Sequence, residues 1–450
     1  MDHYIEGVNE MNKSRTLFVG LMLFSMFFGA GNLIFPPFLG ANAGTNFPLA
    51  IAGFIVTAVG LPLLVLTALS FVKGGARTLA GRVHPIFGLV FTVIVYLSIG
   101  PFLGIPRNAT LAYEMGFKPF IADSSVALFG FTAVFFLLVF LVSLNQSKMV
   151  DLMGKTITPL LLLSMVVLVV TGFMQLKNSS LGPSTLEYQQ FPFLKGFLEG
   201  YNTMDALAAL AFGIVILTTL KQQGVSEGKM MRREMLKAGL LAGSLLAVVY
   251  CSLGYIGVEM AGVGAFENGS VLLSSASSLL FGQWGNLLLG VIFVLACFTT
   301  CVGLVSACGN YFHSLLPKAS YKKITLFFTI ISFVFANFGL NTILSVSVPF
   351  LVATYSLTIV LIVLSFFHPL FGGSPYVYIG AITLTGIIAV YDGLKAFGIK
   401  FGIFDIYMGY LPFAELGLGW IIPSLVGTAI GYGLFVMKRK PLILQKHTLE

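Results

Sequence analysis

Long apolar stretches separated by short polar segments are the main pattern of the chain. A helix needs roughly 20 apolar residues to cross a bilayer, and twelve stretches reach about that length. They are residues 16–40, 48–72, 86–105, 126–145, 153–176, 192–220, 234–258, 285–315, 322–338, 343–367, 376–396 and 417–437. Because lipid offers the backbone no hydrogen bonds, and the stretches are too long and evenly apolar for barrel strands, each is predicted to be a helix. The pattern therefore predicts an all-α polytopic membrane protein with twelve transmembrane helices.

The composition supports the same prediction. Of the 450 residues, 57% are hydrophobic and only 9% are charged, and the mean hydropathy is +0.96. A soluble domain carries about 25% charged residues, so a soluble protein is excluded. No cleavable signal peptide is expected, because residues 1–15 are polar and the apolar stretch that follows them is too long to be part of one.

The basic residues predict the orientation in the membrane. Placing the N-terminus inside puts 19 of the 25 Lys and Arg residues on the inner side and six on the outer side. Cytoplasmic loops carry such an excess, so both termini are predicted to be cytoplasmic, in a protein of the cell (plasma) membrane. The net charge of +8 then belongs to the inner membrane face and not to a nucleic-acid site. Membrane lipid is the implied partner, and no obligate protein partner is evident.

Two of the predicted helices carry their own interruption. Residues 27–37 read FFGAGNLIFPP, and residues 198–210 read LEGYNTMDALAAL. Glycine, asparagine and proline weaken a helix, and a carboxylate such as that of Asp205 is costly in mid-membrane unless it faces a cavity or a partner. Asp205 is therefore predicted to be functional, although an aspartate hydrogen-bonded to a neighbouring helix for packing would also explain it.

The spacing of the interruptions predicts an inverted repeat. Gly29 and Gly200 lie five spans apart, and because five is odd, the second group of helices begins on the opposite side of the membrane. The predicted organisation is a cytoplasmic N-terminus (1–15), a first five-helix repeat (16–176), a second, inverted repeat (191–367), helices 11 and 12 (376–437) and a cytoplasmic tail (438–450). Interrupted helices at matching positions in two halves indicate the binding site of a transporter.

An interrupted helix suits a zwitterionic solute. Its freed N–H groups, at the positive end of the helix dipole, attract a carboxylate, and its freed carbonyl oxygens attract a cation or an ammonium. A channel would instead need a pore lined by rings of carbonyls or charges. GVSEG at residues 224–228 matches a serine-hydrolase pattern but lies in a charged loop without a preceding strand. The prediction is a transporter of α-amino acids and not an enzyme.

Small residues inside the apolar stretches are assigned to packing. GLLAG at residues 239–243 and GTAIG at residues 427–431 place glycines four apart, which suits close helix contacts. The four cysteines lie in apolar stretches without histidine or carboxylate neighbours, so neither a disulfide framework nor a zinc site is predicted. They are Cys251, Cys297, Cys301 and Cys308.

The interrupted segments resemble the branched-chain amino acid:cation symporter family (BrnQ-like, LIVCS). The motifs are LFVGLMLFSMFFGAGNLIFPPFLG at residues 17–40, IGPFLGIPRNAT at residues 99–110 and GYNTMDALAALAFG at residues 200–213, and the resemblance covers essentially the whole chain. It implies the amino acid–polyamine–cation superfamily and a LeuT-like 5+5 inverted repeat with discontinuous helices 1 and 6, plus two extra helices. The implied activity is import of leucine, isoleucine and valine coupled to sodium entry by alternating access.

The resemblance implies a substrate site at the two interruptions. The GxGN motif of LeuT-type transporters matches Gly29, Gly31 and Asn32, which implies that the N–H groups of Ala30, Gly31 and Asn32 hold the substrate carboxylate. The second interruption adds further substrate-binding residues: Tyr201, Asn202, Thr203 and Asp205. Asp205 has no direct counterpart in LeuT and is interpreted as a partner of the substrate ammonium or of the coupling ion. Expected apolar wall residues are Phe28, Tyr96, Tyr201 and Met204.

The resemblance also implies a sodium site beside the first interruption. The carbonyl ligands from span 1 match Ser25 and Phe28, and ACFTT in span 8 supplies the Ala296 carbonyl with the hydroxyls of Thr299 and Thr300. Oxygen ligands are those that hard cations prefer. Sodium is therefore the predicted coupling ion.

The sequence departs from LeuT at two positions, and the coupling ion has an alternative. Met26 stands where an asparagine helps to bind the first sodium of LeuT, and Phe35 stands where LeuT has the arginine of its outer gate. Arg107 follows span 3 and is interpreted either as a gate residue or, equally, as a charge of an extracellular loop. A proton carried by Asp205 is the alternative to sodium.

Overall fold

The computed structural model describes residues 13–72, 74–121, 124–176, 182–226, 228–414 and 417–447. Within these ranges the regular structure is helical, without a strand. Ten helical segments are long and apolar enough to cross a membrane. The prediction of an all-α polytopic membrane protein is therefore confirmed. Of the predicted terminal segments, residues 1–12 and 448–450 lie outside the described residues.

Each of the twelve predicted stretches falls on helix, with η marking short 3₁₀ or π segments. The first part of the chain forms α1 (Lys13–Phe27), α2 (Ala30–Ala43), η1 (Gly44–Asn46), α3 (Phe47–Ile55), η2 (Val56–Gly60), α4 (Leu61–Ser70), α5 (Gly75–Ala80), α6 (Pro85–Leu97), η3 (Ser98–Phe102), α7 (Gly104–Gly116), η4 (Lys118–Phe120), α8 (Ser125–Ser143), α9 (Gln146–Leu152), η5 (Met153–Ile157) and α10 (Thr158–Gln175). The remainder forms α11 (Leu186–Gln190), α12 (Pro192–Glu199), η6 (Gly200–Thr203), α13 (Asp205–Gln222), α14 (Lys229–Met260), α15 (Gly269–Phe281), α16 (Gln283–Leu315), α17 (Tyr321–Ala336), α18 (Leu340–Phe366), α19 (Pro375–Ala396), α20 (Ile403–Gly409) and α21 (Ile421–His447). Helix α15 was not predicted, because this apolar helix has only 13 residues.

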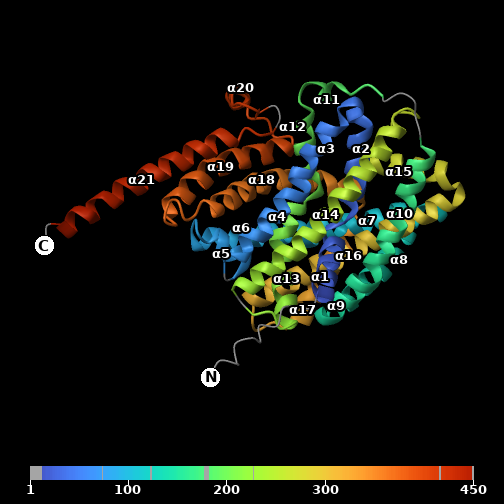
Figure 1. The fold of residues 1–450 in the computed structure, drawn as a ribbon, viewed down its shortest axis with the longest axis horizontal. Coiled ribbons are helices and arrows are strands. Elements are labelled where there is room, and N and C mark those ends of the chain that lie inside the picture. Colours follow the sequence, from blue (N-terminus) through green and yellow to red (C-terminus); the bar gives the residue numbers. More distant parts are fainter. Residues whose placement is uncertain are drawn as a thin grey trace.

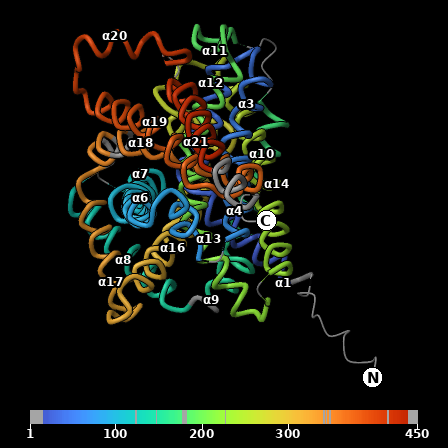
Figure 2. Tube along the Cα trace, turned by 90° about the vertical axis from the view of Figure 1, so that its left-hand side faces the viewer, coloured from blue at the N-terminus to red at the C-terminus, as the bar shows by residue number. Residues whose placement is uncertain are grey.

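The helices form a bundle with an additional layer beside it. Figure 1 shows α1 to α4, α13, α14 and α16 in the bundle, and α18, α19 and α21 as a layer next to it. Both views place α11 and α20 at one end of the molecule, and α9 with the start of α1 at the opposite end (Figures 1 and 2). The predicted outer loops between spans 5 and 6 and between spans 11 and 12 therefore lie at the same end.

Glycines allow the helices to approach closely. A Cβ at Gly243 would lie 3.0 Å from the Leu63 side chain of α4, and a Cβ at Gly427 would lie 2.2 Å from the Gly380 carbonyl oxygen of α19. The packing roles predicted for the two glycine motifs are therefore confirmed. A very close approach also joins α2 to α14, where a Cβ at Gly257 would lie 1.9 Å from the Pro37 carbonyl oxygen.

The α2–α14 contact leads to a stability prediction. Gly257→Ala is expected to lower the free energy of unfolding by about 1–3 kcal/mol, because the added methyl group meets backbone that cannot move away. The matched control is Gly130→Ala on α8, where a Cβ would have no neighbour within 4 Å. The measurement is thermal unfolding of the detergent-purified protein, followed by size-exclusion chromatography. An unchanged midpoint for Gly257→Ala would contradict the close approach.

Candidate functional site

The first predicted interruption is confirmed. Helix α1 ends at Phe27 and α2 begins at Ala30. The Gly29 N–H donates to the Phe27 carbonyl at 2.8 Å and to Asn32 Oδ1 at 3.1 Å. The Ala30 N–H donates to Asn108 Oδ1 of α7 at 2.9 Å. Two of the N–H groups freed by the interruption are thus paired within the protein.

Glycine is required at the first interruption by close approach. A Cβ at Gly29 would lie 2.8 Å from Asn108 Oδ1 and 3.0 Å from Thr300 Oγ1. These two atoms belong to α7 and α16. The interruption in span 1 is therefore enclosed by spans 3 and 8, the second of which carries the predicted sodium ligands.

The second predicted interruption is also confirmed. Helix α12 ends at Glu199, a 3₁₀ turn covers Gly200–Thr203, and α13 begins at Asp205. Met204 between them adopts a left-handed conformation with φ of 65°, which costs a non-glycine residue on the order of 1 kcal/mol or more. This conformation separates the two helices and places the Asp205 side chain in the first turn of α13.

Asp205 joins the two interruptions. Its Oδ2 accepts hydrogen bonds from Asn32 Nδ2 at 2.6 Å and from the Tyr250 hydroxyl of α14 at 3.1 Å. Asn32 Nδ2 also contacts the Tyr250 hydroxyl. All three side chains are buried, Asp205 with 2% exposure. Asp205 therefore makes the interhelical hydrogen bonds expected of a packing residue, and it also lines the cavity described next.

A polar cavity of about 30 Å³ lies between the two interruptions. This volume holds about two water molecules and is too small for a branched-chain amino acid. Spans 1, 3, 6 and 8 all contribute to its walls. Its polar lining residues are Asn32, Arg107, Asn108, Thr203, Asp205 and Thr300, and its apolar ones include Met26, Ile99, Met204 and Leu304.

Arg107 lies in this cavity and not in a loop. Helix α7 continues to Gly116, well past the predicted end of span 3, and Arg107 is only 7% exposed. Its Nη1 donates to the Asn202 carbonyl oxygen at 3.3 Å, and its guanidinium lies 5.4 Å from the centroid of the Phe35 ring. The interpretation of Arg107 as an extracellular loop charge is therefore wrong. The hydropathy pattern placed the end of span 3 at residue 105, whereas the helix extends to Gly116.

Of the remaining predicted substrate residues, Gly31 and Thr203 line the cavity, whereas the side chains of Tyr201 and Asn202 contact other residues. A Cβ at Gly31 would lie 3.4 Å from the Asn202 carbonyl oxygen. The Asn202 side chain instead donates to Glu199 Oε2 at 3.0 Å. The Tyr201 ring stacks on Tyr355 at 4.5 Å between centroids.

Of the four expected wall residues, only Met204 is among those lining the cavity. Tyr96 stacks on Tyr311 of α16 at 4.0 Å. Phe28 stacks on Phe24 at 5.2 Å. The rings of Phe28, Tyr96 and Tyr201 thus serve helix packing in this conformation.

Four of the five predicted sodium ligands come together beside the first interruption. The Thr299 hydroxyl donates to the Ser25 carbonyl at 2.8 Å and to the Ala296 carbonyl at 3.0 Å. Thr300 Oγ1 lies 3.5 Å from the same Ser25 oxygen. The fifth, Phe28, lies within the interruption itself. The arrangement brings oxygen atoms together, and oxygen is the ligand type that hard cations prefer.

A third interruption, in span 3, escaped the sequence analysis. The π segment Ser98–Phe102 contains Gly100 with non-helical φ and ψ of −84° and −117°. Cys308 Sγ donates to the Tyr96 carbonyl oxygen at 3.5 Å, and Cys301 Sγ donates to the Ile105 carbonyl oxygen at 3.5 Å. Two cysteines assigned to packing therefore also satisfy carbonyls on either side of this break. The adjacent Gly100 and Pro101 are the sequence feature from which this interruption could have been predicted.

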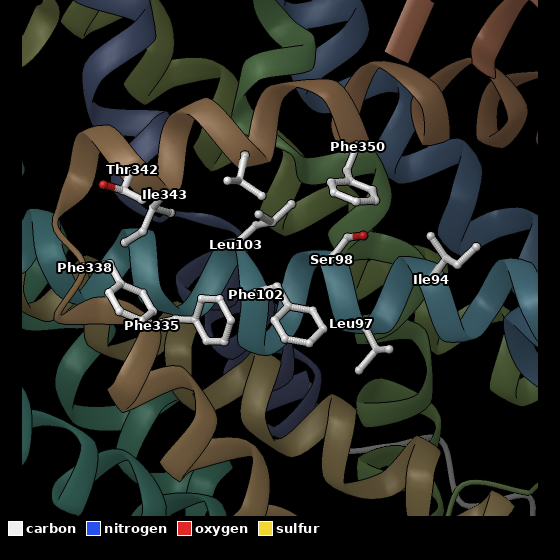
Figure 3. Close-up of a pocket in the computed structure, with 11 residues that line it drawn as sticks. Ile94, Leu97, Ser98, Phe102, Leu103, Phe335, Phe338, Thr342, Ile343 and Phe350 are labelled. Carbon is white, nitrogen blue, oxygen red and sulfur yellow. The ribbon is translucent and has the colours of Figure 1, made fainter. Parts of the chain in front are cut away.

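A larger, apolar cavity lies beside the same segment of span 3. It has a volume of about 310 Å³ and is lined by side chains of α6, η3, α17 and α18 (Figure 3). Ser98 and Thr342 contribute its hydroxyls, and most of its other lining residues are aromatic or aliphatic. A zwitterion needs partners for two charges, so the smaller polar cavity is the candidate substrate site.

Comparison with known proteins identifies the family. The family described as branched-chain amino acid transport protein has a sequence model that matches residues 12–439. The chain belongs to this family. Its relatives include the branched-chain amino acid permease BrnQ of Bacillus subtilis (strain 168), 45% identical over 436 residues that cover 96% of this chain and 99% of BrnQ. The permease BraB of the same organism is 43% identical, with 93% and 95% of the two chains covered.

A further relative supports this membership, and a solved structure of another family shares the fold. The branched-chain amino acid transport system 2 carrier protein of Pseudomonas aeruginosa is 41% identical over 90% of this chain and 93% of its own. Mhp1, a nucleobase-cation-symport-1 family transporter solved in a closed conformation with bromovinylhydantoin bound, matches with a TM-score of 0.60 at 13% identity, covering 94% and 93% of the two chains. Family members and fold are those of a transporter, and the prediction that the protein is not an enzyme is confirmed.

Proposed function

We propose that the protein imports leucine, isoleucine and valine across the plasma membrane together with sodium, by alternating access. The observation that carries this proposal is the meeting of two interrupted helices at one buried cavity through the Asn32–Asp205 hydrogen bond. Family membership and the permease names of the relatives support the class of substrate. The oxygen atoms around Thr299, beside the first interruption, support sodium.

The proposed architecture is twelve crossing helices in a 5+5 inverted repeat with two further helices. The interruptions at Gly29 and Gly200 support the repeat, since they occur at equivalent positions in the two halves. With Arg107 buried in the cavity, five basic residues are left on the predicted outer side against 19 on the inner side. This ratio supports cytoplasmic termini.

The small size of the cavity supports alternating access. A space of about 30 Å³ has to enlarge before a branched side chain can enter, so the interrupted helices have to move relative to spans 3 and 8. Selectivity among the three amino acids is expected to be low, because one methylene group changes binding by only about 1–3 kcal/mol.

The membrane potential and the sodium gradient together supply the driving force. One positive charge per cycle contributes about 2.3 kcal/mol at 100 mV, and a tenfold sodium gradient adds about 1.4 kcal/mol. One-to-one coupling then supports accumulation on the order of several hundredfold.

The experiment that tests the coupling ion is leucine uptake into proteoliposomes with one gradient imposed at a time. An inward sodium gradient without a pH gradient is expected to drive accumulation, and an inward proton gradient without sodium is not. Equal accumulation with protons alone would establish the second candidate, a proton-coupled transporter of the same fold. That candidate rests on Asp205, the buried carboxylate of the cavity.

A further inference from the structure

The charge pattern of the polar cavity assigns a role to Arg107. The family resemblance implied that the N–H groups of Ala30, Gly31 and Asn32 at the first interruption bind the substrate carboxylate. Of the three predicted N–H groups, that of Ala30 donates to Asn108 Oδ1, and the neighbouring Gly29 N–H donates to Asn32 Oδ1. A carboxylate that entered the cavity would therefore find fewer free backbone donors than an open helix end supplies.

A guanidinium group is available at the same place. Arg107 is more than nine-tenths buried and lines the cavity, and its Nε has no hydrogen-bond partner among the residues that the structure describes. A buried donor without a partner is uncommon and costly in a native protein. The guanidinium is also held in place, because Nη1 donates to the Asn202 carbonyl and the group lies over the Phe35 ring.

The opposite charge of the cavity belongs to Asp205. No ion pair joins Arg107 to Asp205 among those of the described residues, although both side chains line the same enclosed space. A permanent cation and a carboxylate thus line one cavity without an ion pair between them. A molecule carrying a carboxylate and an ammonium group on the same carbon atom complements this arrangement.

We propose that Arg107 binds the substrate carboxylate, with its unpaired Nε as the donor, while Asp205 receives the substrate ammonium. This assignment rests on the proposed function and adds the basis of its selectivity for α-amino acids. Arg107 thereby becomes a substrate-binding residue. Its contact with the Asn202 carbonyl also ties it to the second interruption, so binding of the carboxylate would act on both interrupted helices.

The test uses competition against radiolabelled leucine on the purified full-length chain. The competitors are leucine itself and isopentylamine, which is leucine without its carboxylate. Arg107→Gln is expected to weaken leucine binding about thirtyfold, the usual range for one hydrogen bond to a charged group. It is expected to change isopentylamine binding less than about threefold. The ratio of the two affinities should therefore fall by about tenfold or more.

Two further variants separate binding from a structural role. Arg107→Lys keeps the charge without the planar guanidinium and is expected to retain part of the preference for leucine. Arg232→Gln is the matched control, because Arg232 also lies over a phenylalanine ring, Phe71 at 4.8 Å, but is exposed. Its affinity ratio is expected to equal that of the wild type.

Two outcomes would overturn the assignment. One is a wild-type affinity ratio in Arg107→Gln. The other is an equal loss of both ligands in the Arg107 variants, which is what a purely structural arginine predicts. Failure of sodium-driven uptake by the wild-type protein would instead contradict the proposed coupling and leave the measured ratio intact, so the two failures are distinguishable.

Discussion

Asp205→Asn is expected to lower leucine uptake about a thousandfold, to background. Removing one charge from a buried, hydrogen-bonded arrangement costs about 3–5 kcal/mol. Asparagine keeps the shape of the side chain but replaces an acceptor pair by an acceptor and a donor. Asn32 Nδ2 and the Tyr250 hydroxyl both donate to Asp205 Oδ2, so a donor turned toward them leaves buried groups unpaired, and the substrate ammonium loses its countercharge.

The measurement is sodium-driven uptake in proteoliposomes, followed by leucine counterflow without any ion gradient. If Asp205 holds the ammonium, counterflow is lost together with uptake. If Asp205 carries a coupled proton instead, counterflow persists while accumulation is lost. The matched control is Asp392→Asn, since Asp392 lies on α19 in a separate cavity with Tyr391 and Lys395 and is expected to be dispensable. Normal uptake by Asp205→Asn would refute the proposed site.

The parts of the site that depend on local chain chemistry were predictable from the sequence. Glycine and asparagine close together weaken an apolar helix locally, so the breaks next to Gly29 and Gly200 were predicted at the observed positions. Asp205 was recognisable because a carboxylate is costly in lipid. The same reasoning, applied to Gly100 and Pro101, would have found the third interruption.

Contacts between distant segments were not predictable in the same way. Asn108 lies 78 residues from its partner Ala30, and Tyr250 lies 45 residues from Asp205. Nothing in the local sequence of either residue indicates these pairs. They follow from the general requirement that buried donors find acceptors, which also explains why the Ala30 N–H, one of the three expected to be free at the first interruption, is paired.

Arg107 shows the limit of hydropathy as a guide to helix ends. A charged residue lowers the mean hydropathy of the sequence around it, so span 3 was predicted to end before Arg107. In the structure, α7 continues for nine residues beyond Arg107, to Gly116. A buried arginine is tolerated here because it faces a polar cavity and the Asn202 carbonyl. In a membrane protein, a charge at the apparent end of a span is therefore worth testing as part of a site.

Thr300→Ala is expected to abolish sodium-coupled accumulation of leucine, by raising the sodium concentration for half-maximal uptake about a hundredfold. Each oxygen ligand contributes to the affinity of a site for a hard cation, and Thr300 Oγ1 lies beside both the Ser25 carbonyl oxygen and the first interruption. Thr299→Ala is expected to act in the same direction. Its hydroxyl lies within hydrogen-bond distance of three carbonyl oxygens, those of Ser25, Leu295 and Ala296, and would have to turn its lone pairs toward the ion.

The matched control for both variants is Thr385→Ala. Thr385 is also fully buried and donates to a carbonyl of its own helix, Ala381 at 2.7 Å, but it lies on α19 and does not line the polar cavity. Sodium titration of leucine uptake should therefore separate Thr299 and Thr300 from Thr385. A sodium dependence that is the same in all three variants as in the wild type would remove the threonine pair from the ion site. It would leave Asp205 as the remaining candidate for coupling, because its buried carboxylate is the one group of the cavity that can take up a proton or neutralise a cation.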